Sequence, residues 1–411
     1  MKQKIAIWGT GKRAEKFLLS YGDIFDVQCF YDSTNFGFEK YGIIVKQYDP
    51  TDNIKIIIAS TYWEEISDQL EKYGKKYLVD YIDSEAYEDG IQYEEIYKRY
   101  DGNTEIIKYS NWCGRKYAVI SGNCQTSRYE DLLARNQEFS RDYIIVKVPK
   151  VCDWSVRSSL MEKWLADDVF WKNIDLYIYQ YVQEENRFSK LLFSDRTLVR
   201  LRQDCQKLRI VNTYFDGYWP QIKKLSIAKR HCLAVAELGQ IGYSDKYIEK
   251  FAEQGFAFDE ILEKIEKMDF FSEQEMKEAI QKSLAKIKDK EQECDVKISD
   301  YIIDNYDKKQ LFYSPNHPIE EVLLEYLNRI LTRLGYAQWK ISIADFNIYS
   351  ETLKGQDVPI YKSVINYLGV NEFERVYFPN RYVIPKCSLD RKGFFKFYFD
   401  LYKSEQGTIA Y

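Results

Sequence analysis

Short apolar runs alternate with helix-like segments along the first half of this chain, and this alternation constrains the fold most strongly. The first four runs lie at residues 4–8, 26–31, 54–59 and 77–81. The segment 64–72, between the third and fourth runs, has helical periodicity. Strands that alternate with helices pair in parallel, because each helix carries the chain back across the sheet. The sequence therefore predicts a Rossmann-like parallel-sheet module over residues 1–84.

The alternation resumes at Lys116, after a polar and tyrosine-rich stretch, residues 85–115, that we interpret as a linker with one helix near residues 92–99. Four more apolar runs predict strands, at residues 117–121, 143–148, 174–179 and 207–211. Charged segments with helical periodicity indicate a helical insertion over about residues 244–306. We therefore expect an α/β fold class, in which a helix-rich α/β domain over residues 116–411 follows the N-terminal module.

Local signals predict where later elements begin and end. Ser272-Glu-Gln-Glu275 has the form of a capping box and opens a long helix. Pro318 suits the first position of the amphipathic helix that Gly335 ends, which would place His317 at the N-cap. The aromatic run Gly393–Phe399 favours a strand or a packed sheet edge.

The charge balance and the cysteine pattern exclude several classes of protein. Lys and Arg total 59 and Asp and Glu total 64, so the net charge of −5 lacks the basic field of a dedicated nucleic-acid binder. No apolar run approaches the roughly 18 residues of a membrane span. The first apolar stretch stops at Gly9, so we expect no signal peptide and a cytoplasmic location. Eight irregularly spaced cysteines predict neither a disulfide framework nor a metal site.

The first strand leads into a glycine-rich turn, Gly9-x-Gly11-x-x-Ala14, and Asp32 ends the next strand. This spacing is typical of a dinucleotide fingerprint, in which the glycines allow a tight turn and the approach of a phosphate to the backbone. One interpretation is a cofactor-binding site for a nucleotide or nucleotide sugar at these four residues. The other is a turn whose glycines serve only its geometry, and the sequence leaves both open.

A second strand–turn–helix junction contains Gly122-Asn123-Cys124-Gln125. Ligands of open α/β sheets bind at the carboxyl ends of the strands, where this turn lies. A thiol at a helix N-terminus has a lowered pKa and more thiolate. The alternative is an inert cysteine in an ordinary turn.

The chain has two histidines, and His317 has the better context for catalysis. At an N-cap the helix dipole would keep its imidazole neutral, as a general base requires. The alternative role is helix capping or packing. His231 has basic neighbours, Lys229 and Arg230, and we interpret it as structural.

Four segments resemble the WcbI-type polysaccharide biosynthesis proteins. They are Val119–Gln125, Asp175–Gln180, Phe312–Pro318 and Val358–Tyr361. The resemblance covers about residues 116–370 and implies an acetyltransferase of capsule assembly that binds coenzyme A. The first module looks like the half-Rossmann modules that precede sugar-modifying domains in surface-polysaccharide enzymes.

That family is similar in turn to SGNH-type esterases and acyltransferases, and the chain departs from both patterns. Cys124 stands where the SGNH enzymes have their nucleophilic serine, in the block Gly122-Asn123-Cys124. Ser314 stands where the last SGNH block has an aspartate, three residues before the histidine. Either another acid orients His317, or the pair works as a dyad. Trp219 stands before Pro220, where the family often has histidine, which implies a changed acceptor.

The leading expectation is therefore transfer of an acetyl group from acetyl-coenzyme A to a sugar hydroxyl. Cys124 and His317 would be catalytic, and the predicted oxyanion or substrate contacts are Gly122, Asn123, Gln125, Gln180 and Asn316. A cysteine-dependent carbohydrate esterase would use the same pair. A non-catalytic protein that binds a glycan or nucleotide sugar is the third alternative, and a homodimer stays open as the assembly.

Overall fold

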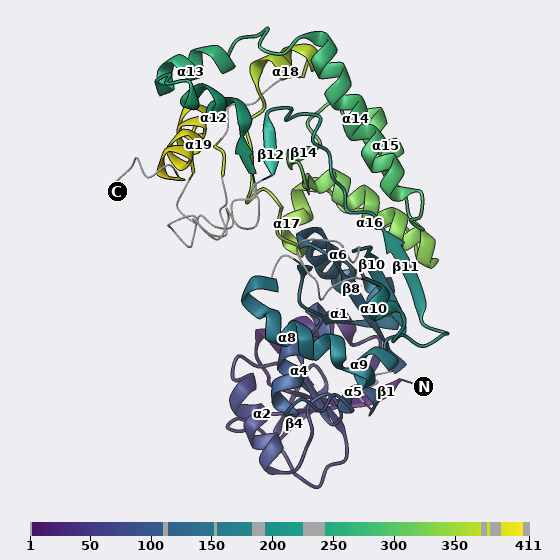
Figure 1. Ribbon diagram of the computed structural model, residues 1–411. Coiled ribbons are helices and arrows are strands. Elements are labelled where there is room, and N and C mark those ends of the chain that lie inside the picture. The colour runs from purple at the N-terminus through teal and green to yellow at the C-terminus, as the bar shows by residue number, and fades with distance from the viewer. Residues whose placement is uncertain are drawn as a thin grey trace. The chain divides into compact units, whose positions relative to one another are not determined.

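The computed structural model describes residues 2–109, 114–151, 154–182, 194–224, 243–370, 376–378 and 388–405. The fold is α/β, as expected (Figure 1). The chain forms two compact units. The first unit comprises Met1–Ser121, Glu130–Ile178 and Leu191–Lys207. The second comprises Gly122–Tyr129, Tyr179–Lys190 and Leu208–Tyr411.

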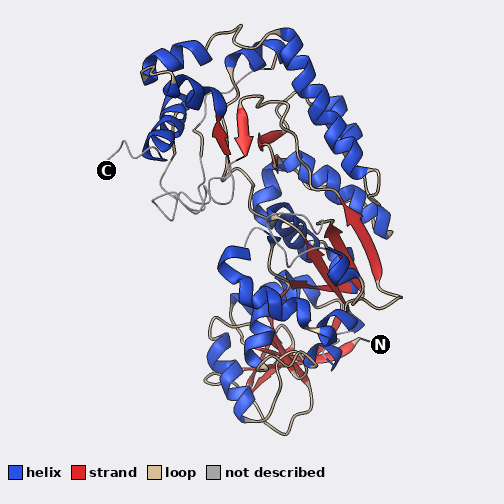
Figure 2. Cartoon of the chain, in the orientation of Figure 1, coloured by secondary structure: helices blue, strands red, loops and turns tan. Residues whose placement is uncertain are grey.

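The N-terminal sheet has six strands in the order β3-β4-β2-β1-β5-β6, among the red arrows of Figure 2. They are β1 (Gln3–Trp8), β2 (Phe25–Tyr31), β3 (Phe38–Lys40), β4 (Ile43–Lys46), β5 (Lys55–Ile58) and β6 (Tyr81–Asp83). As predicted, β1 pairs in parallel with β2 and β5. The expected four strands were too few, because the short antiparallel pair β3–β4 extends one edge.

The fourth expected strand begins four residues later than predicted, at Tyr81. Residues 77–80 form a turn instead, in which Leu78 has a φ of 63° and the Asp80 N–H bonds to the Lys76 carbonyl. Apolar side chains are buried in such a turn as well as in a strand, so the apolar pattern did not distinguish them.

The stretch expected to be a linker, residues 85–115, contains secondary structure. Its elements are α3 (Ser84–Asp89), β7 (Ile91–Gln92), α4 (Tyr93–Arg99) and α5 (Ile106–Tyr109). Strand β7 pairs in parallel with β9 (Tyr143–Lys147) and so joins the second sheet. Buried side chains at Tyr87, Tyr93 and Ile96 explain why this polar stretch is ordered. A separate binding module at residues 1–84 stays a prediction.

The second sheet has five strands in the order β11-β10-β8-β9-β7. The strands not yet given are β8 (Lys116–Ser121), β10 (Leu176–Gln180) and β11 (Gln206–Ile210). The helices of this region are α6 (Cys124–Arg135), α7 (Gln137–Asp142), α8 (Trp154–Ala166), α9 (Asp168–Lys172) and α10 (Ser194–Leu198). Neighbouring strands β8 and β10 end at Ser121 and Gln180, next to the predicted motif.

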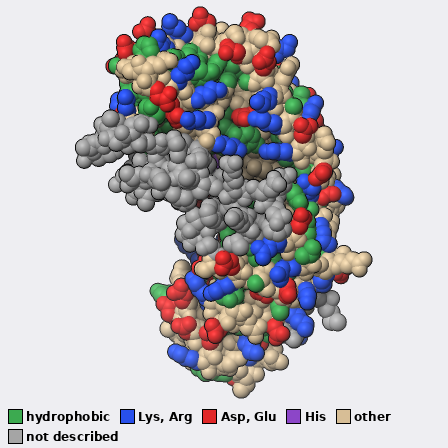
Figure 3. All heavy atoms as spheres, viewed as in Figure 1, with side chains coloured by type: hydrophobic (Ala, Val, Ile, Leu, Met, Phe, Trp, Pro, Cys, Tyr) green, Lys and Arg blue, Asp and Glu red, His purple; other side chains and the backbone are tan. Residues whose placement is uncertain are grey.

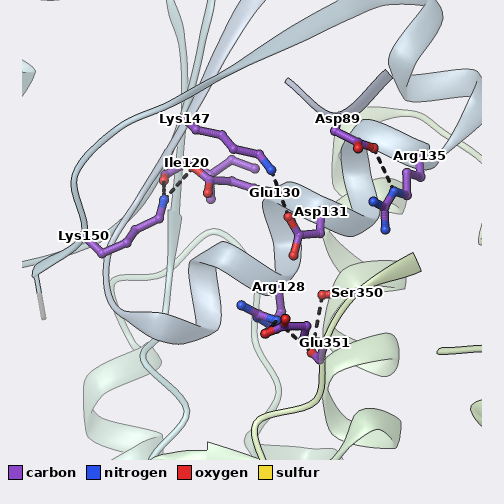
Figure 4. Close-up of polar contacts among 10 residues, drawn as sticks. All are labelled: Asp89, Ile120, Arg128, Glu130, Asp131, Arg135, Lys147, Lys150, Ser350 and Glu351. Atoms are coloured by element: carbon purple, nitrogen blue, oxygen red, sulfur yellow. Dashed lines mark hydrogen bonds and ion pairs between the residues drawn. The ribbon is translucent and has the colours of Figure 1, made fainter. Parts of the chain in front are cut away.

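Ion pairs fasten α6 along its length (Figure 4). Its Glu130 is buried and pairs with buried Lys150 at 2.5 Å, and Nζ of Lys150 also donates to the Ile120 carbonyl at 2.9 Å. Two further pairs are Asp131–Lys147 at 3.0 Å and Arg135–Asp89 at 2.9 Å. A buried pair is costly to break, because the remaining charge is left without compensation.

The helices of the second unit follow in chain order. They are α12 (Lys246–Glu253), α13 (Phe258–Ile265), α14 (Glu273–Glu291), α15 (Ser299–Asn305), α16 (Glu320–Leu334), α17 (Phe346–Tyr349), α18 (Lys362–Leu368) and α19 (Arg391–Glu405). The antiparallel pairs are β12 (Ile222–Lys224) with β13 (Tyr243–Asp245), and β14 (Phe312–Ser314) with β15 (His317–Pro318). The predicted capping box at Ser272 and the left-handed end at Gly335 are both present.

Two expectations about this unit are wrong. His317 is not an N-cap, because α16 begins at Glu320 with Ile319 as its N-cap, while His317 and Pro318 pair with β14. Gly393–Phe399 lies in α19 rather than in a strand. Its buried positions Phe394, Phe395, Tyr398 and Leu401 recur with helical spacing, which the dense aromatic run obscured.

The described surface carries mixed charges. On the face drawn in Figure 3, Lys and Arg side chains are interspersed with Asp and Glu. Among the described residues, no helix has both the length and the apolar character to cross a membrane.

Candidate active site

Cys124 and His317, 193 residues apart in the chain, lie together in the second unit. Cys124 is the first residue of α6, and its Sγ atom lies 3.4 Å from Nε2 of His317. Cys124 is partly exposed, whereas only 7% of His317 is exposed. The positive end of the helix macrodipole stabilises a thiolate, and a neutral imidazole in contact can accept the thiol proton.

Close packing leaves no room for a side chain at Gly122. A Cβ atom there would lie 2.5 Å from Oε1 of Gln180 and 2.6 Å from Cγ2 of Thr126. Oε1 of Gln180 is fixed in this position, because it accepts a hydrogen bond from the Asn123 N–H at 3.0 Å. Gly122 therefore allows the turn to pack against the end of β10.

Asn123 organises the first turn of α6. Its Oδ1 accepts a hydrogen bond from the Gln125 N–H at 3.0 Å, and its carbonyl accepts one from the Thr126 N–H at 2.9 Å. Its Nδ2 donates to Oδ1 of Asn212 at 2.9 Å, which ties the turn to the segment after β11. Asn123 thus acts as a capping group and fixes the direction of the helix N-terminus.

The buried Gln125 side chain joins three segments around the pair. Its Nε2 donates to the carbonyls of Thr213 and Asn316, each at 2.7 Å. Its Oε1 accepts from the Thr213 N–H at 3.0 Å and from Nε2 of Gln180 at 3.4 Å. Because Asn316 precedes His317, these bonds hold the β14–β15 turn against the start of α6.

These contacts involve the donors of the predicted oxyanion site. The Gln125 N–H, Nδ2 of Asn123 and Nε2 of Gln180 all donate to acceptors within the protein. Buried polar groups keep such partners, because a lost bond is not replaced by water. One N–H of each group is thus engaged within the protein, and a role of these three residues in oxyanion or substrate contacts stays a prediction. Asn316, whose Oδ1 accepts from the Tyr243 hydroxyl at 2.9 Å, remains a predicted substrate contact.

Burial keeps the imidazole of His317 neutral. It lowers the pKa of His317 to about 4, and the positive charge of Arg128 acts in the same direction. Backbone groups of Leu353 and Gln356 favour the protonated form and oppose this shift. The His317 imidazole is therefore neutral near pH 7, and the cause is burial and not a helix dipole.

Ser314 lies opposite His317 in the β14–β15 pair and does not replace the missing acid. Among the described residues, neither the Ser314 hydroxyl nor Nδ1 of His317 has a hydrogen-bond partner of good geometry, although both atoms are buried. No carboxylate of the described residues therefore orients the imidazole through Nδ1. The contact that the structure shows is the one between Cys124 and His317.

Sequence reasoning overlooked Arg128, which lies one helical turn after Cys124. Figure 4 shows it pointing from α6 to Glu351, where its Nη1 donates to the backbone carbonyl at 3.0 Å and approaches the carboxylate at 3.5 Å. The spacing of four residues places Arg128 on the same face of α6 as the cysteine. That spacing is the signal that could have identified it.

Trp219 is a buried packing residue. It is 1% exposed, its indole Nε1 donates to the Val358 carbonyl at 3.1 Å, and its ring packs on Tyr218. This position gives the tryptophan a structural role in the second unit. A changed acceptor because of Trp219 stays a prediction.

The glycine-rich turn of the first unit has structural reasons for its residues. Gly9 has a φ of 121°, and a Cβ there would lie 2.6 Å from the Ala59 carbonyl oxygen. Gly11 is the N-cap of α1 (Lys12–Tyr21), and Ala14 is buried on that helix. Burial raises the pKa of Asp32, but bonds from Thr34, Asn35 and Thr10 lower it overall.

Both carboxylate oxygens of Asp32 accept hydrogen bonds within the turn. The proposed ribose contact would have to compete with them, which favours the structural interpretation of this residue. His231 lies outside the described residues. Within the described part of the chain, no group of three or more His, Cys, Asp or Glu is arranged to hold a metal ion.

The fold and the site define an α/β protein with a cysteine–histidine pair at the end of a sheet strand. A family model, the polysaccharide biosynthesis enzyme WcbI, matches residues 117–338, so the chain belongs to the WcbI family of polysaccharide biosynthesis enzymes. This confirms the resemblance seen in the sequence.

A solved structure of WcbI, described as a novel polysaccharide biosynthesis enzyme, has a similar fold. The TM-score is 0.57 at 19% identity, over 71% of this chain and 90% of that chain. That structure is described as the native protein without a disulfide bond between COA and one of its cysteines. No curated protein matches the chain.

Proposed function

We propose that this protein is a coenzyme A-dependent O-acetyltransferase that acts on a sugar hydroxyl in surface-polysaccharide (capsule) biosynthesis. The observation that carries the proposal is the 3.4 Å contact between Sγ of Cys124 and Nε2 of the neutral His317. The same proposal includes an SGNH-like active site, a cytoplasmic location of the protein, and catalytic roles for Cys124 and His317.

The site fits an acyl thioester. Cys124 is partly exposed at a helix N-terminus, so a thioester carbon can approach its sulfur. The description of the solved WcbI structure, which pairs COA with a cysteine, supports the same ligand here. When bound, acetyl-coenzyme A supplies an activated acetyl group.

His317 performs the proton transfers. On one route, Nε2 takes the proton of the Cys124 thiol as Sγ bonds to the acetyl carbon, the bond from that carbon to the coenzyme A sulfur breaks, and the leaving thiolate takes the proton back from the imidazolium. Nε2 then takes the sugar hydroxyl proton as the sugar oxygen forms the ester bond, and Sγ leaves as a thiolate that regains this proton. On the other route, Nε2 takes the sugar hydroxyl proton directly, the sugar oxygen bonds to the acetyl carbon, and coenzyme A leaves as the thiolate that receives the proton. Positioned proton transfer contributes about 10²–10⁴-fold in rate.

The test compares His317→Ala and Cys124→Ser with wild type, with acetyl-coenzyme A and a panel of nucleotide-linked and lipid-linked sugars. Cys294→Ser is the control, since Cys294 is partly exposed and lies three residues after the end of α14. We expect His317→Ala to lose about 10²–10⁴-fold in turnover, while coenzyme A binding stays within a few-fold. Near-normal turnover in His317→Ala would refute the dyad.

Two alternatives give different results in the same assay. A carbohydrate esterase releases acetate from acetylated glycans and gains no thermal stability from coenzyme A. A non-catalytic binding protein retains glycan or nucleotide-sugar affinity in all variants and shows no turnover.

A further inference from the structure

A second group of charged side chains lies beside the turn that holds Cys124. The segment 212–216 follows β11, and its residues alternate in exposure. Thr213 and Phe215 are buried, whereas Asn212, Tyr214 and Asp216 are partly exposed. The first of the partly exposed residues of this segment, Asn212, accepts a hydrogen bond from Asn123, which precedes Cys124 in the chain.

One stripe of α14 packs against this segment. Oγ of Ser283 accepts a hydrogen bond from the Asp216 N–H at 2.9 Å, and Nζ of Lys286 pairs with the Asp216 carboxylate at 2.8 Å. Lys290 lies on the same stripe, one turn after Lys286, and its Nζ lies 5.3 Å from the centroid of the Tyr214 ring.

A third lysine completes the cluster. Nζ of Lys224, at the end of β12, lies 4.4 Å from the centroid of the Tyr214 ring. The cluster of Lys224, Lys286 and Lys290 around Tyr214 holds three positive charges, and Asp216 offsets one of them. Lys290 is exposed as a whole residue, but desolvation of its ammonium group lowers its pKa; the charge of Lys286 acts in the same direction and Asp216 opposes both. A bound anion would relieve this repulsion.

We propose that this lysine cluster binds the phosphate groups of a nucleotide-type ligand whose other end reaches Cys124. The claim that the other end of the ligand reacts at Cys124 depends on the proposed function. The claim that its phosphates are bound depends on the lysine cluster alone. Two residues span at most about 7 Å, so the backbone of Tyr214 lies close to that of Asn212, which contacts Asn123. Coenzyme A and nucleotide-linked sugars both carry a diphosphate that lysine ammonium groups can bind.

Binding of coenzyme A, dephospho-coenzyme A, pantetheine, uridine diphosphate glucose and inorganic pyrophosphate is measured by calorimetry. The test variant is Lys286→Ala with Lys290→Ala. The matched control is Lys277→Ala with Lys288→Ala, which removes two exposed charges from the opposite face of the same helix. A second variant, Lys286→Arg with Lys290→Arg, keeps the charge.

We expect the test variant to bind its phosphate-bearing ligand at least about tenfold more weakly, with pantetheine binding unchanged and both other variants near wild type. Weaker binding of coenzyme A identifies the acyl donor as the ligand, and weaker binding of the nucleotide sugar identifies the acceptor. Loss of pyrophosphate binding in the test variant supports the lysine cluster as a phosphate site even if coenzyme A does not bind to the wild-type protein. Absence of coenzyme A binding would refute only the proposed acyl donor. Equal affinities in all variants, or no binding of any phosphate probe by wild type, would overturn the inference.

Discussion

Nε2 of Gln125 donates a hydrogen bond to the carbonyl of Asn316 at 2.7 Å, across 191 residues of chain. The first of these residues follows the candidate nucleophile, and the second precedes the candidate base. The position of the His317 imidazole against the Cys124 thiol thus depends on one buried amide. Because that amide also bonds to Thr213 and Gln180, it has no capacity left for a ligand.

Replacing Gln125 by glutamate should remove the hydrogen bonds that its Nε2 donates while keeping nearly the same side-chain shape. The carboxylate would face the carbonyls of Thr213 and Asn316, which need donors, so we expect a loss of about 2–4 kcal/mol in the free energy of unfolding. Urea denaturation measures this loss, and Gln281→Glu, on the exposed side of α14, serves as the control. A stable Gln125→Glu protein with normal acetyl transfer would show that the amide does not position the histidine.

Substitution of Gly122 by alanine should disrupt the packing of the turn against the side chains of Gln180 and Thr126. The added methyl group would meet Gln180 and Thr126 at 2.5–2.6 Å, and such overpacking typically costs about 1–3 kcal/mol. Gly11→Ala is the matched control, since an added Cβ there has no atom within 4 Å. Thermal unfolding should therefore shift for Gly122→Ala alone. If the two variants unfold alike, the packing described for Gly122 is incorrect.

The two histidines allow a direct measurement of the base by NMR. We expect one Hε1 resonance, assigned with His231→Asn, to titrate near pH 4, because burial disfavours the imidazolium of His317. Arg128→Gln should move this midpoint upward, since a positive charge is removed. A midpoint near 6.5 in the wild-type protein would contradict the buried, neutral imidazole.

The same pKa links His317 to stability. Its folded-state pKa of about 4 lies below the ordinary value of 6.5, so the unfolded chain binds more protons between these values. The free energy of unfolding should therefore fall as the pH drops through this window, by at most about 3 kcal/mol. Denaturation curves at pH 7.5 and 4.5 for wild type and His317→Gln isolate this contribution. Equal pH dependence in both proteins would argue against it.

Alkylation should distinguish Cys124 from the other described cysteines. Cys29 and Cys205 are buried, and burial raises the pKa of both thiols. Cys294 is partly exposed like Cys124, yet burial raises its pKa to about 11. Iodoacetamide at pH 7 followed by mass spectrometry should find Cys124 modified first, because a helix N-terminus stabilises its thiolate. Faster labelling of Cys294 would count against a reactive Cys124.

The sequence was sufficient to locate most strands and the two motifs. Runs such as 54–59 and 143–148 are apolar because both faces of these strands are covered, and short buried strands have no other common sequence form. The capping box at Ser272 and the glycine at 335 marked helix ends because their side-chain and backbone requirements are local.

Two of the features that the sequence did not reveal depend on contacts between residues distant in the chain. Pro318 is equally suited to a helix start and to the edge of a short strand pair, and only pairing with β14 decides between them. The bonds from Gln125 to Thr213 and Asn316 cross 88 and 191 residues, and no local pattern encodes them.

The low pKa of His317 has a consequence for a cell under acid stress. An ordinary histidine changes its protonation state when the surrounding pH falls from 7 to 6, and an enzyme that relies on it slows accordingly. Buried as it is, this imidazole remains an unprotonated base across that whole interval. Under the proposed function, the rate of acetyl transfer would then follow the concentrations of acyl donor and acceptor, with little dependence on pH between 7 and 6.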